Sequence, residues 1–200
     1  LKKREIDLLK YIFIFVTFFA LPINAHTFTG MIGFYDGLSH PVLGLDHFLA
    51  MVSVGIISSL IGGRAIWTIP SLFVIMMIVG GILGMIVEIS LIFSQLNIFF
   101  IAYTVEIGII LSVILLGLAI VIQKRLSSVI ILFFISIFGL CHGLAHGMEI
   151  PWAANPILFA LGFSSGTATL HIFGVGIGIF SNRSNFSNWA LRFLGVVFVI

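Results

Sequence analysis

The sequence is poor in charged residues and in cysteine, and it has no nucleotide-binding loop. Only 8% of its 200 residues are charged and 60% are hydrophobic, which excludes an ordinary soluble domain. The single cysteine, Cys141, excludes an internal disulfide framework. A Walker loop and a basic patch are both missing, so neither nucleotide hydrolysis nor nucleic-acid binding is expected. An ATP-driven pump would also need a soluble domain, and no loop is long enough to form one.

Apolar runs of about 20 residues recur along the chain, and each is long enough to cross a lipid bilayer as a helix. Together with a mean hydropathy of +1.29, they predict an all-α fold, a polytopic transmembrane bundle of about six helices. One transmembrane helical domain is expected over residues 26–200. The predicted segments are Leu38–Ile61, Ile66–Phe93, Ile98–Ile122, Val129–Met148, Asn155–Phe180 and Trp189–Ile200.

Residues 1–25 resemble a secretory signal peptide. Basic residues precede an apolar stretch at 11–21 that is short for a membrane span, and residues 22–25 resemble a cleavage site. We expect cleavage after Ala25, and an uncleaved anchor helix is the alternative. Cleavage would make His26 the new N-terminus, with an α-amine and an imidazole outside the membrane. His26 is then either a metal-capture group or an ordinary terminus.

Charged residues are distributed unevenly between the two expected sides of the membrane. The bases after residue 25 fall in alternate loops or near the same side, at Arg64, Lys124, Arg125, Arg183 and Arg192. The acids fall on the other side, at Asp36, Asp46, Glu88, Glu106 and Glu149. Because basic loops stay in the cytoplasm, the pattern predicts a multi-pass protein of the bacterial inner (cytoplasmic) membrane. Carboxylates lining an outer vestibule would concentrate cations there.

The stretch Phe138–Glu149 contains the most informative polar residues. Read as a helix at about 100° per residue, it places His142, His146 and Glu149 on one stripe. Two imidazoles and a carboxylate favour a first-row transition metal, and such groups are costly within a bilayer unless they have a function. A pair of histidines that form hydrogen bonds between helices is the structural alternative.

Histidines in the first apolar run extend this candidate site. His40 and His47 are i,i+7 and would share one face of a single helix. Asp46 flanks that face and could orient an imidazole as a hydrogen-bond acceptor. At about 1.5 Å per residue, His47, His142 and Glu106 come to one depth below the outer surface.

Three further features of the runs bear on an ion path. Glu88 is expected slightly nearer the outer surface than the common depth of His47, His142 and Glu106. It follows a face of small residues, Gly80 and Gly84, and this face predicts close helix packing. His171 is expected much deeper, either as an inner relay or as a buried histidine satisfied by Thr167. Glycines at 174, 176 and 178 indicate close packing or, alternatively, a helix break that exposes carbonyls to an ion.

The two histidine-containing stretches resemble the motifs of a known family. His40 to His47 is similar to an H-x5-D-H motif, and His142 to Glu149 is similar to an H-G-x-A-H-G-x-E motif. Both are typical of HupE/UreJ-type hydrogenase and urease accessory membrane proteins, the nickel/cobalt permeases. The resemblance covers roughly residues 26–180 and implies uptake of Ni²⁺ or Co²⁺ as the transported ion, with no permanently bound cofactor. The metal-site positions that it implies are His40, Asp46, His47, His142, His146 and Glu149.

Three functions remain open at this point. The first is a permease for a divalent transition metal, driven by the membrane potential. Candidate ligands at two depths favour this function, because they form a path across the membrane. An intramembrane zinc-dependent hydrolase is permitted by the H-x3-H spacing of His142 and His146, although an H-E-x-x-H motif is missing. The third is a metal-sensing or accessory subunit. The expected partners are a divalent metal ion and the lipid bilayer, with a homo-oligomer or a downstream metallochaperone left open.

Overall fold

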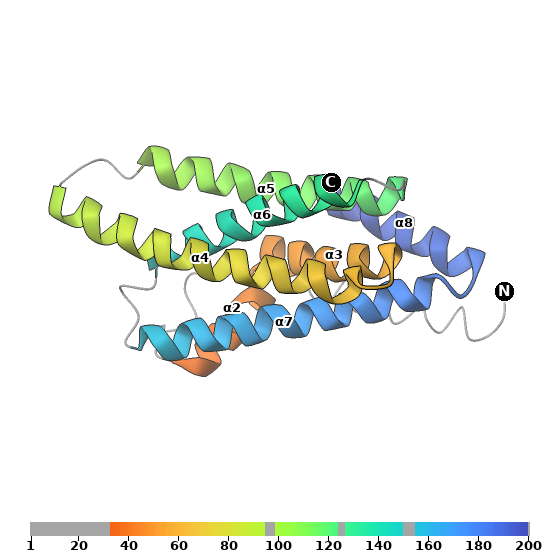
Figure 1. The fold of residues 1–200 in the computed structure, drawn as a ribbon, viewed down its shortest axis with the longest axis horizontal. Coiled ribbons are helices and arrows are strands. Elements are labelled where there is room, and N and C mark those ends of the chain that lie inside the picture. The colour runs from red at the N-terminus through yellow and green to blue at the C-terminus, as the bar shows by residue number, and fades with distance from the viewer. Residues whose placement is uncertain (1–32, 95–98, 124–126, 150–154, 200) are drawn as a thin grey trace.

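The computed structural model describes residues 33–94, 99–123, 127–149 and 155–199, and within these ranges it contains helices and no strand. The predicted all-α bundle is confirmed (Figure 1). The expected signal peptide and His26 lie outside the described residues. The helices are α2 (Phe34–Leu43), α3 (Leu45–Ile61), α4 (Ala65–Ser94), α5 (Phe99–Ile122), α6 (Ser128–Glu149), α7 (Pro156–Ser181) and α8 (Asn185–Val199).

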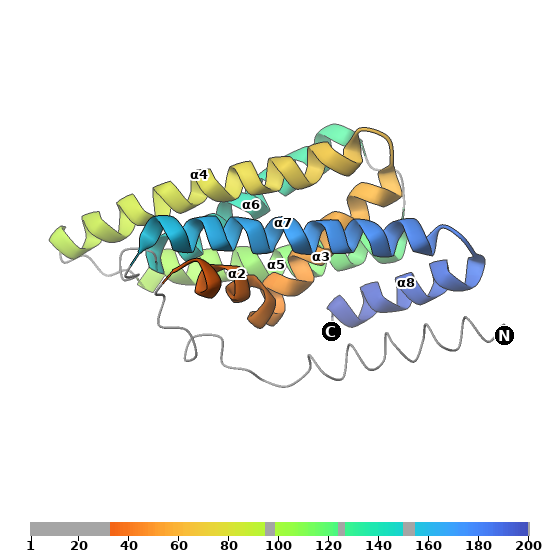
Figure 2. The ribbon, with the colours of Figure 1, turned by 90° about the horizontal axis from the view of Figure 1, so that it is seen from below.

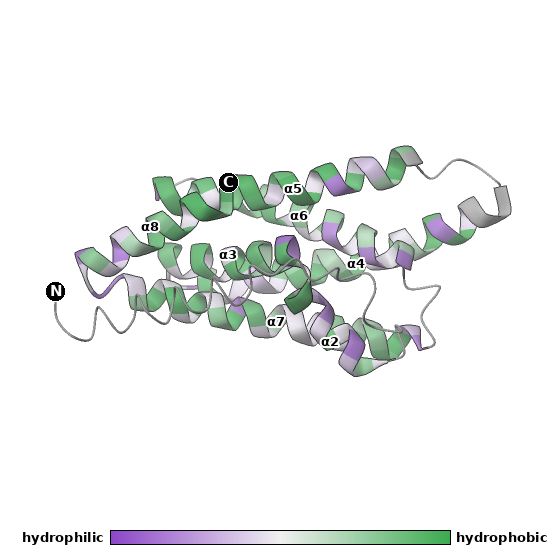
Figure 3. Ribbon diagram, turned by 180° about the vertical axis from the view of Figure 1, so that it is seen from behind, coloured by the Kyte–Doolittle hydropathy of each residue, from purple (hydrophilic) through white to green (hydrophobic). Residues whose placement is uncertain are grey.

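Four of the helices, α4 to α7, are long and apolar enough to cross a membrane, and the bent pair α2–α3 makes a fifth candidate span. Hydrophobic residues predominate along these helices (Figure 3). Phe100, Val129 and Ile157 are each more than 70% exposed. Exposure of so many large apolar side chains is unfavourable in water and is expected where helices face lipid. The chain is therefore built as a multi-pass membrane protein. Helix α8 has 15 residues and is shorter than a typical span.

The first predicted segment, Leu38–Ile61, is not the single helix that its apolar pattern predicts. Helix α2 ends at Leu43, Gly44 is extended with φ −79° and ψ 111°, and α3 begins at Leu45. The two axes differ by 84°. Pro41 lacks a backbone N–H and Gly44 has low helix propensity, so the chain is weakest as a helix at this point. The turn is closed by the Gly44 N–H, which donates to the carbonyl of His40 at 3.1 Å.

Close helix packing at glycine brings α4 and α6 together. A Cβ atom at Gly80 would lie against the carbonyl of Leu140, and one at Gly143 against the carbonyl of Met77. The backbones therefore approach as closely as small residues allow, which is a common mode of association in membranes. The packing role predicted for Gly80 and its neighbour Gly84 is confirmed, because Gly84 lies in the same way against Leu144.

Helices α3 and α7 lie side by side and run in the same direction (Figures 1 and 2). A Cβ atom at Gly55 would lie against the carbonyl of His171, and one at Gly174 against the carbonyl of Val52. Helix α7 is continuous from Pro156 to Ser181. The alternative of a break at its glycines is therefore wrong. Gly174 and Gly178 provide close packing against α3, whereas a Cβ atom at Gly176 would meet nothing within 4 Å.

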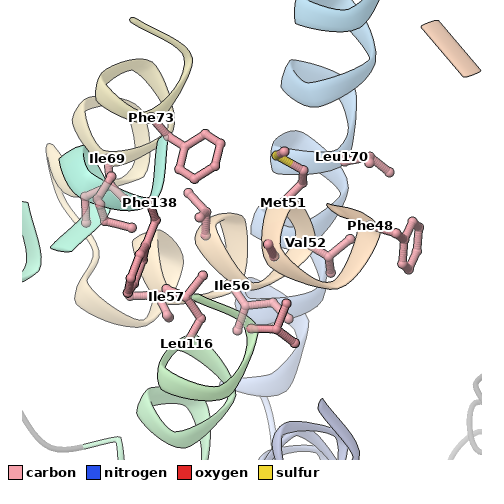
Figure 4. Close-up of a cluster of buried hydrophobic side chains, with 14 of the residues drawn as sticks. Phe48, Met51, Val52, Ile56, Ile57, Ile69, Phe73, Leu116, Phe138 and Leu170 are labelled. Atoms are coloured by element: carbon pink, nitrogen blue, oxygen red, sulfur yellow. The ribbon is translucent and has the colours of Figure 1, made fainter. Parts of the chain in front are cut away.

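The apolar core surrounds α3, on which every residue from Ala50 to Ser59 is buried. Figure 4 shows Phe73 of α4, Phe138 of α6 and Leu116 of α5 around this helix. The core occupies the middle of the bundle. Beside the bend between α2 and α3, buried polar side chains replace apolar ones.

Candidate metal centre

Four imidazole rings from three helices meet beside the α2–α3 bend. His40 lies in the last turn of α2, His47 in the first turn of α3, and His142 and His146 one turn apart on α6. The ring centroid of His47 is 4.5 Å from that of His146 and 5.1 Å from that of His142. The centroids of His40 and His146 are 4.7 Å apart. The two predicted motifs, separated by about a hundred residues, thus form one cluster.

His40 and His47 do not share one face of a continuous helix, as the i,i+7 spacing predicts. The helix is broken between them at Gly44, and the 84° turn is what brings their ring centroids to 6.4 Å. A straight helix would separate residues seven apart by about 10 Å along its axis. The bend therefore brings both imidazoles closer together beside α6 than a straight α2–α3 helix would.

Each of three imidazoles is held through its Nδ1 atom. His47 Nδ1 lies 2.7 Å from Asp46 Oδ1, and His142 Nδ1 lies 2.8 Å from the carbonyl oxygen of Phe138. His146 Nδ1 lies 3.3 Å from Glu149 Oε2. Because a carbonyl or a carboxylate only accepts, these contacts place the proton on Nδ1 and leave the lone pair on Nε2. This is the arrangement that orients a histidine for metal binding.

The opposite nitrogens of these three rings have no protein partner. Nε2 of His47, His142 and His146 is buried and forms no hydrogen bond with any described residue. An unpaired polar atom in a protein interior costs about 1–3 kcal/mol, so three in one cluster are unusual unless something binds them. Nitrogen lone pairs next to carboxylates form a donor set suited to a divalent transition metal.

A second group of candidate ligands overlaps the first at its outer edge. Ligand atoms of His40, His146 and Glu149 lie within 4.8 Å of one another, close enough to bind one ion. His40 Nε2 is 3.9 Å from Glu149 Oε2. His146 belongs to both groups, so an ion could pass from one to the other without leaving imidazole contact.

Aromatic rings that the sequence did not identify enclose the cluster. The Phe163 ring lies 4.2 Å from His146 and 5.9 Å from His40, between centroids, and the Phe73 ring lies 5.5 Å from His142. A mostly apolar cavity of about 180 Å³ reaches His146 from between α4 and α7. These phenylalanines belong to apolar runs and have no distinguishing spacing, so only the fold reveals their position.

The predicted path residues Glu88, Glu106 and His171 make no described hydrogen bond or ring contact with the four clustered histidines. Glu106 is exposed on α5, and no described contact joins it to the histidines, so α5 adds no carboxylate to the layer expected from its depth. Glu88 is buried on α4, 9% exposed, one turn beyond Gly84. His171 is buried on α7 with its ring against that of Phe73, at 5.2 Å between centroids.

Comparison with known proteins identifies the family of the chain. The profile of one protein family, described as HupE / UreJ protein, matches residues 14–200. Protein HupE of Rhizobium leguminosarum bv. viciae is 39% identical over 160 residues, which cover 79% of this chain and 78% of that protein. No solved structure matches the chain. The chain therefore belongs to the HupE/UreJ family, as its two histidine motifs predicted.

Proposed function

We propose that the chain is a permease that takes up a divalent transition metal, Ni²⁺ or Co²⁺, across the bacterial inner membrane. The observation that carries the proposal is the set of Nε2 atoms of His47, His142 and His146, all buried and all without a hydrogen-bond partner among the described residues. Membership of the HupE/UreJ family supports a nickel or cobalt role in hydrogenase or urease assembly.

The donor atoms select the class of ion. Imidazole nitrogen with a few carboxylate oxygens suits Ni²⁺, Co²⁺ and Zn²⁺, whereas Mg²⁺ and Ca²⁺ prefer ligand sets made of oxygen alone. Asp46 and Glu149 contact Nδ1 of His47 and His146, and they lend negative charge to a site that must stabilise a dication. Both carboxylates are partly exposed, 49% for Asp46 and 29% for Glu149, so the cluster is reached from this side.

Transport requires that the site release the ion as well as bind it. Four imidazoles from α2, α3 and α6, together with the carboxylates of Asp46 and Glu149, offer more donors than the four that a tetrahedral ion needs, which allows stepwise exchange of ligands. His146 is shared between the outer group with His40 and Glu149 and the inner contact with His47. A dication would move from the outer group to the inner contact by exchanging one ligand at a time while it stays bound to His146.

The membrane potential supplies enough energy for accumulation. A dication moving inward gains about 4.6 kcal/mol at 100 mV, since each charge contributes about 2.3 kcal/mol. This corresponds to about 2000-fold accumulation at equilibrium. Neither nucleotide hydrolysis nor proton coupling is needed to concentrate a trace metal.

The proposal is tested by measuring metal accumulation in bacterial cells that express this chain, for each ion in turn. We expect Ni²⁺ or Co²⁺ to accumulate above the level of cells carrying an empty vector and of cells that express His47→Ala at equal abundance. Equal accumulation in all three strains would contradict it. Metal content of the purified protein after dialysis separates the alternatives, because a hydrolase retains its zinc while a permease releases its ion.

A further inference from the structure

His171 lies inside the bundle, below the histidine cluster, and neither of its ring nitrogens has a described partner. It is 2% exposed and stands on α7, past the midpoint of the helix. His142 offers a direct comparison, because it is equally buried and also helical. His142 satisfies its Nδ1 with the carbonyl four residues earlier, at 2.8 Å, whereas His171 makes no such bond.

A purely structural role for His171 would need a partner that the structure does not provide. Thr167, one turn earlier on α7, is fully buried, and its hydroxyl contacts the sulfur of Met77 at 3.7 Å. The predicted alternative, in which Thr167 satisfies His171, is therefore wrong. An imidazole left unpaired in an apolar core costs about 1–3 kcal/mol per polar atom, with nothing in the fold to offset it.

A second unpaired polar atom lies at the same level of the bundle. The Ser53 hydroxyl on α3 is 0% exposed and has no described partner. Val52 and Gly55, on either side of it, pack against Gly174 and the His171 carbonyl of α7. Two side chains with unpaired polar atoms thus lie on neighbouring stretches of α3 and α7, beside the apolar core.

The position of His171 continues the series of imidazoles inward. Met77 contacts Thr167 and also packs against α6 at Gly143, the residue after His142, so Thr167 and His142 are at similar depth. His171 is four residues further along α7, about 6 Å deeper. The ring of Phe73 bridges the two histidines, with centroids 5.5 Å from His142 and 5.2 Å from His171.

We propose that His171 is an inner binding station for the transported dication, reached from His142 past the Phe73 ring. This inference rests on the proposed function and adds a position to its path. The station has one imidazole, with the unpaired Ser53 hydroxyl near its level, so the ion keeps part of its water shell. A sparse ligand set binds weakly, which suits release toward the opposite side.

Substitutions that separate packing from ligation test the proposal on the full-length protein. His171→Leu keeps much of the volume but removes the nitrogens, and His171→Cys retains an atom that binds borderline metals. Each variant is measured for Co²⁺ binding in detergent by calorimetry and for Co²⁺ uptake in proteoliposomes. Leu170→Met, a volume-conserving change at the neighbouring buried residue, is the matched control.

We expect His171→Leu to bind Co²⁺ at the outer cluster within about twofold of wild type and to lose about tenfold or more in uptake rate. His171→Cys should keep most of the uptake, and Leu170→Met all of it. If His171→Leu does not reach the membrane, His171→Asn replaces it, because Asn and Cys are close in size but differ in metal affinity. Uptake at the wild-type rate in the Leu or Asn variant would overturn the inner station. A wild-type chain that takes up no metal would contradict the proposed function itself, and this inference with it.

Discussion

Asp46 accepts two hydrogen bonds from the residue that follows it, from His47 Nδ1 at 2.7 Å and from the His47 backbone N–H at 2.8 Å. One carboxylate thereby fixes both the first turn of α3 and the orientation of the imidazole. The Nε2 atom of His47 is directed into the buried cluster as a consequence. Both residues lie in the first turn of α3, directly after the extended Gly44.

Asp46→Asn tests this relationship. The amide can still accept a hydrogen bond but carries no charge, so we expect Co²⁺ affinity to fall by about 10–100-fold while the protein stays folded. Isothermal calorimetry on the detergent-solubilised protein measures the change. Asp36→Asn is the matched control, because Asp36 accepts from the Gly33 N–H at the start of α2 and is not part of the cluster. Equal affinity in both variants would remove Asp46 from the site.

Alanine substitution of the cluster histidines tests the ligands themselves. His47→Ala, His142→Ala and His146→Ala each remove one unpaired Nε2, and each should reduce metal uptake by about tenfold or more while membrane abundance stays near normal. Ser39→Ala, next to His40, should leave uptake unchanged. Loss of the proteins from the membrane would show that the histidines are structural, and normal uptake would exclude them as ligands.

Gly44→Ala tests the bend between α2 and α3. A Cβ atom there would lie 3.2 Å from His47 Nδ1 and 3.4 Å from Asp46 Oδ1, so the pair must shift. Alanine also favours a continuous helix by about 1 kcal/mol relative to glycine. We expect weaker Co²⁺ binding with little loss of thermal stability. Gly33→Ala, where a Cβ atom meets nothing within 4 Å, should bind as wild type. Unchanged binding in Gly44→Ala would mean that the bend does not position the site.

Gly143→Leu tests the close contact between α4 and α6. Any side chain at this position meets the carbonyl of Met77, so α6 must move away from α4. Overpacking of this kind typically costs about 1–3 kcal/mol, and we expect a lower melting temperature in detergent together with loss of uptake. Gly176→Ala on α7, where a Cβ atom would meet nothing within 4 Å, is the control. A melting temperature equal to that of wild type would show that the helices can separate without consequence.

Apolar run length predicted the helices well, because a bilayer demands about 20 apolar residues from each span. The predicted Ile98–Ile122 differs from α5, Phe99–Ile122, by one residue. The pattern could not reveal the break at Gly44, since hydropathy continues across it and only Pro41 and Gly44 distinguish the position. The error is informative, because the break lies within the first histidine motif and brings the rings of His40 and His47 together.

The candidate site was predictable in its residues but not in its arrangement. Motif spacing identified His142, His146 and Glu149, because i,i+4 and i,i+3 steps on a helix lie on one face. Depth counting placed Glu106 in the same layer, yet that carboxylate is exposed on α5. Depth along an axis does not give the direction in which a side chain points, and that direction depends on how each helix is rotated against its neighbours.

The central claim is that this chain alone moves a transition-metal dication through the histidine cluster, driven by membrane potential. The direct measurement is uptake of radioactive Ni²⁺ or Co²⁺ by proteoliposomes containing only the purified full-length protein, with an imposed potential. We predict uptake without ATP that is faster with the interior negative and that is lost in the His47→Ala, His142→Ala double variant. An uptake rate that does not depend on the imposed potential, or uptake that persists in the double variant, would contradict the account.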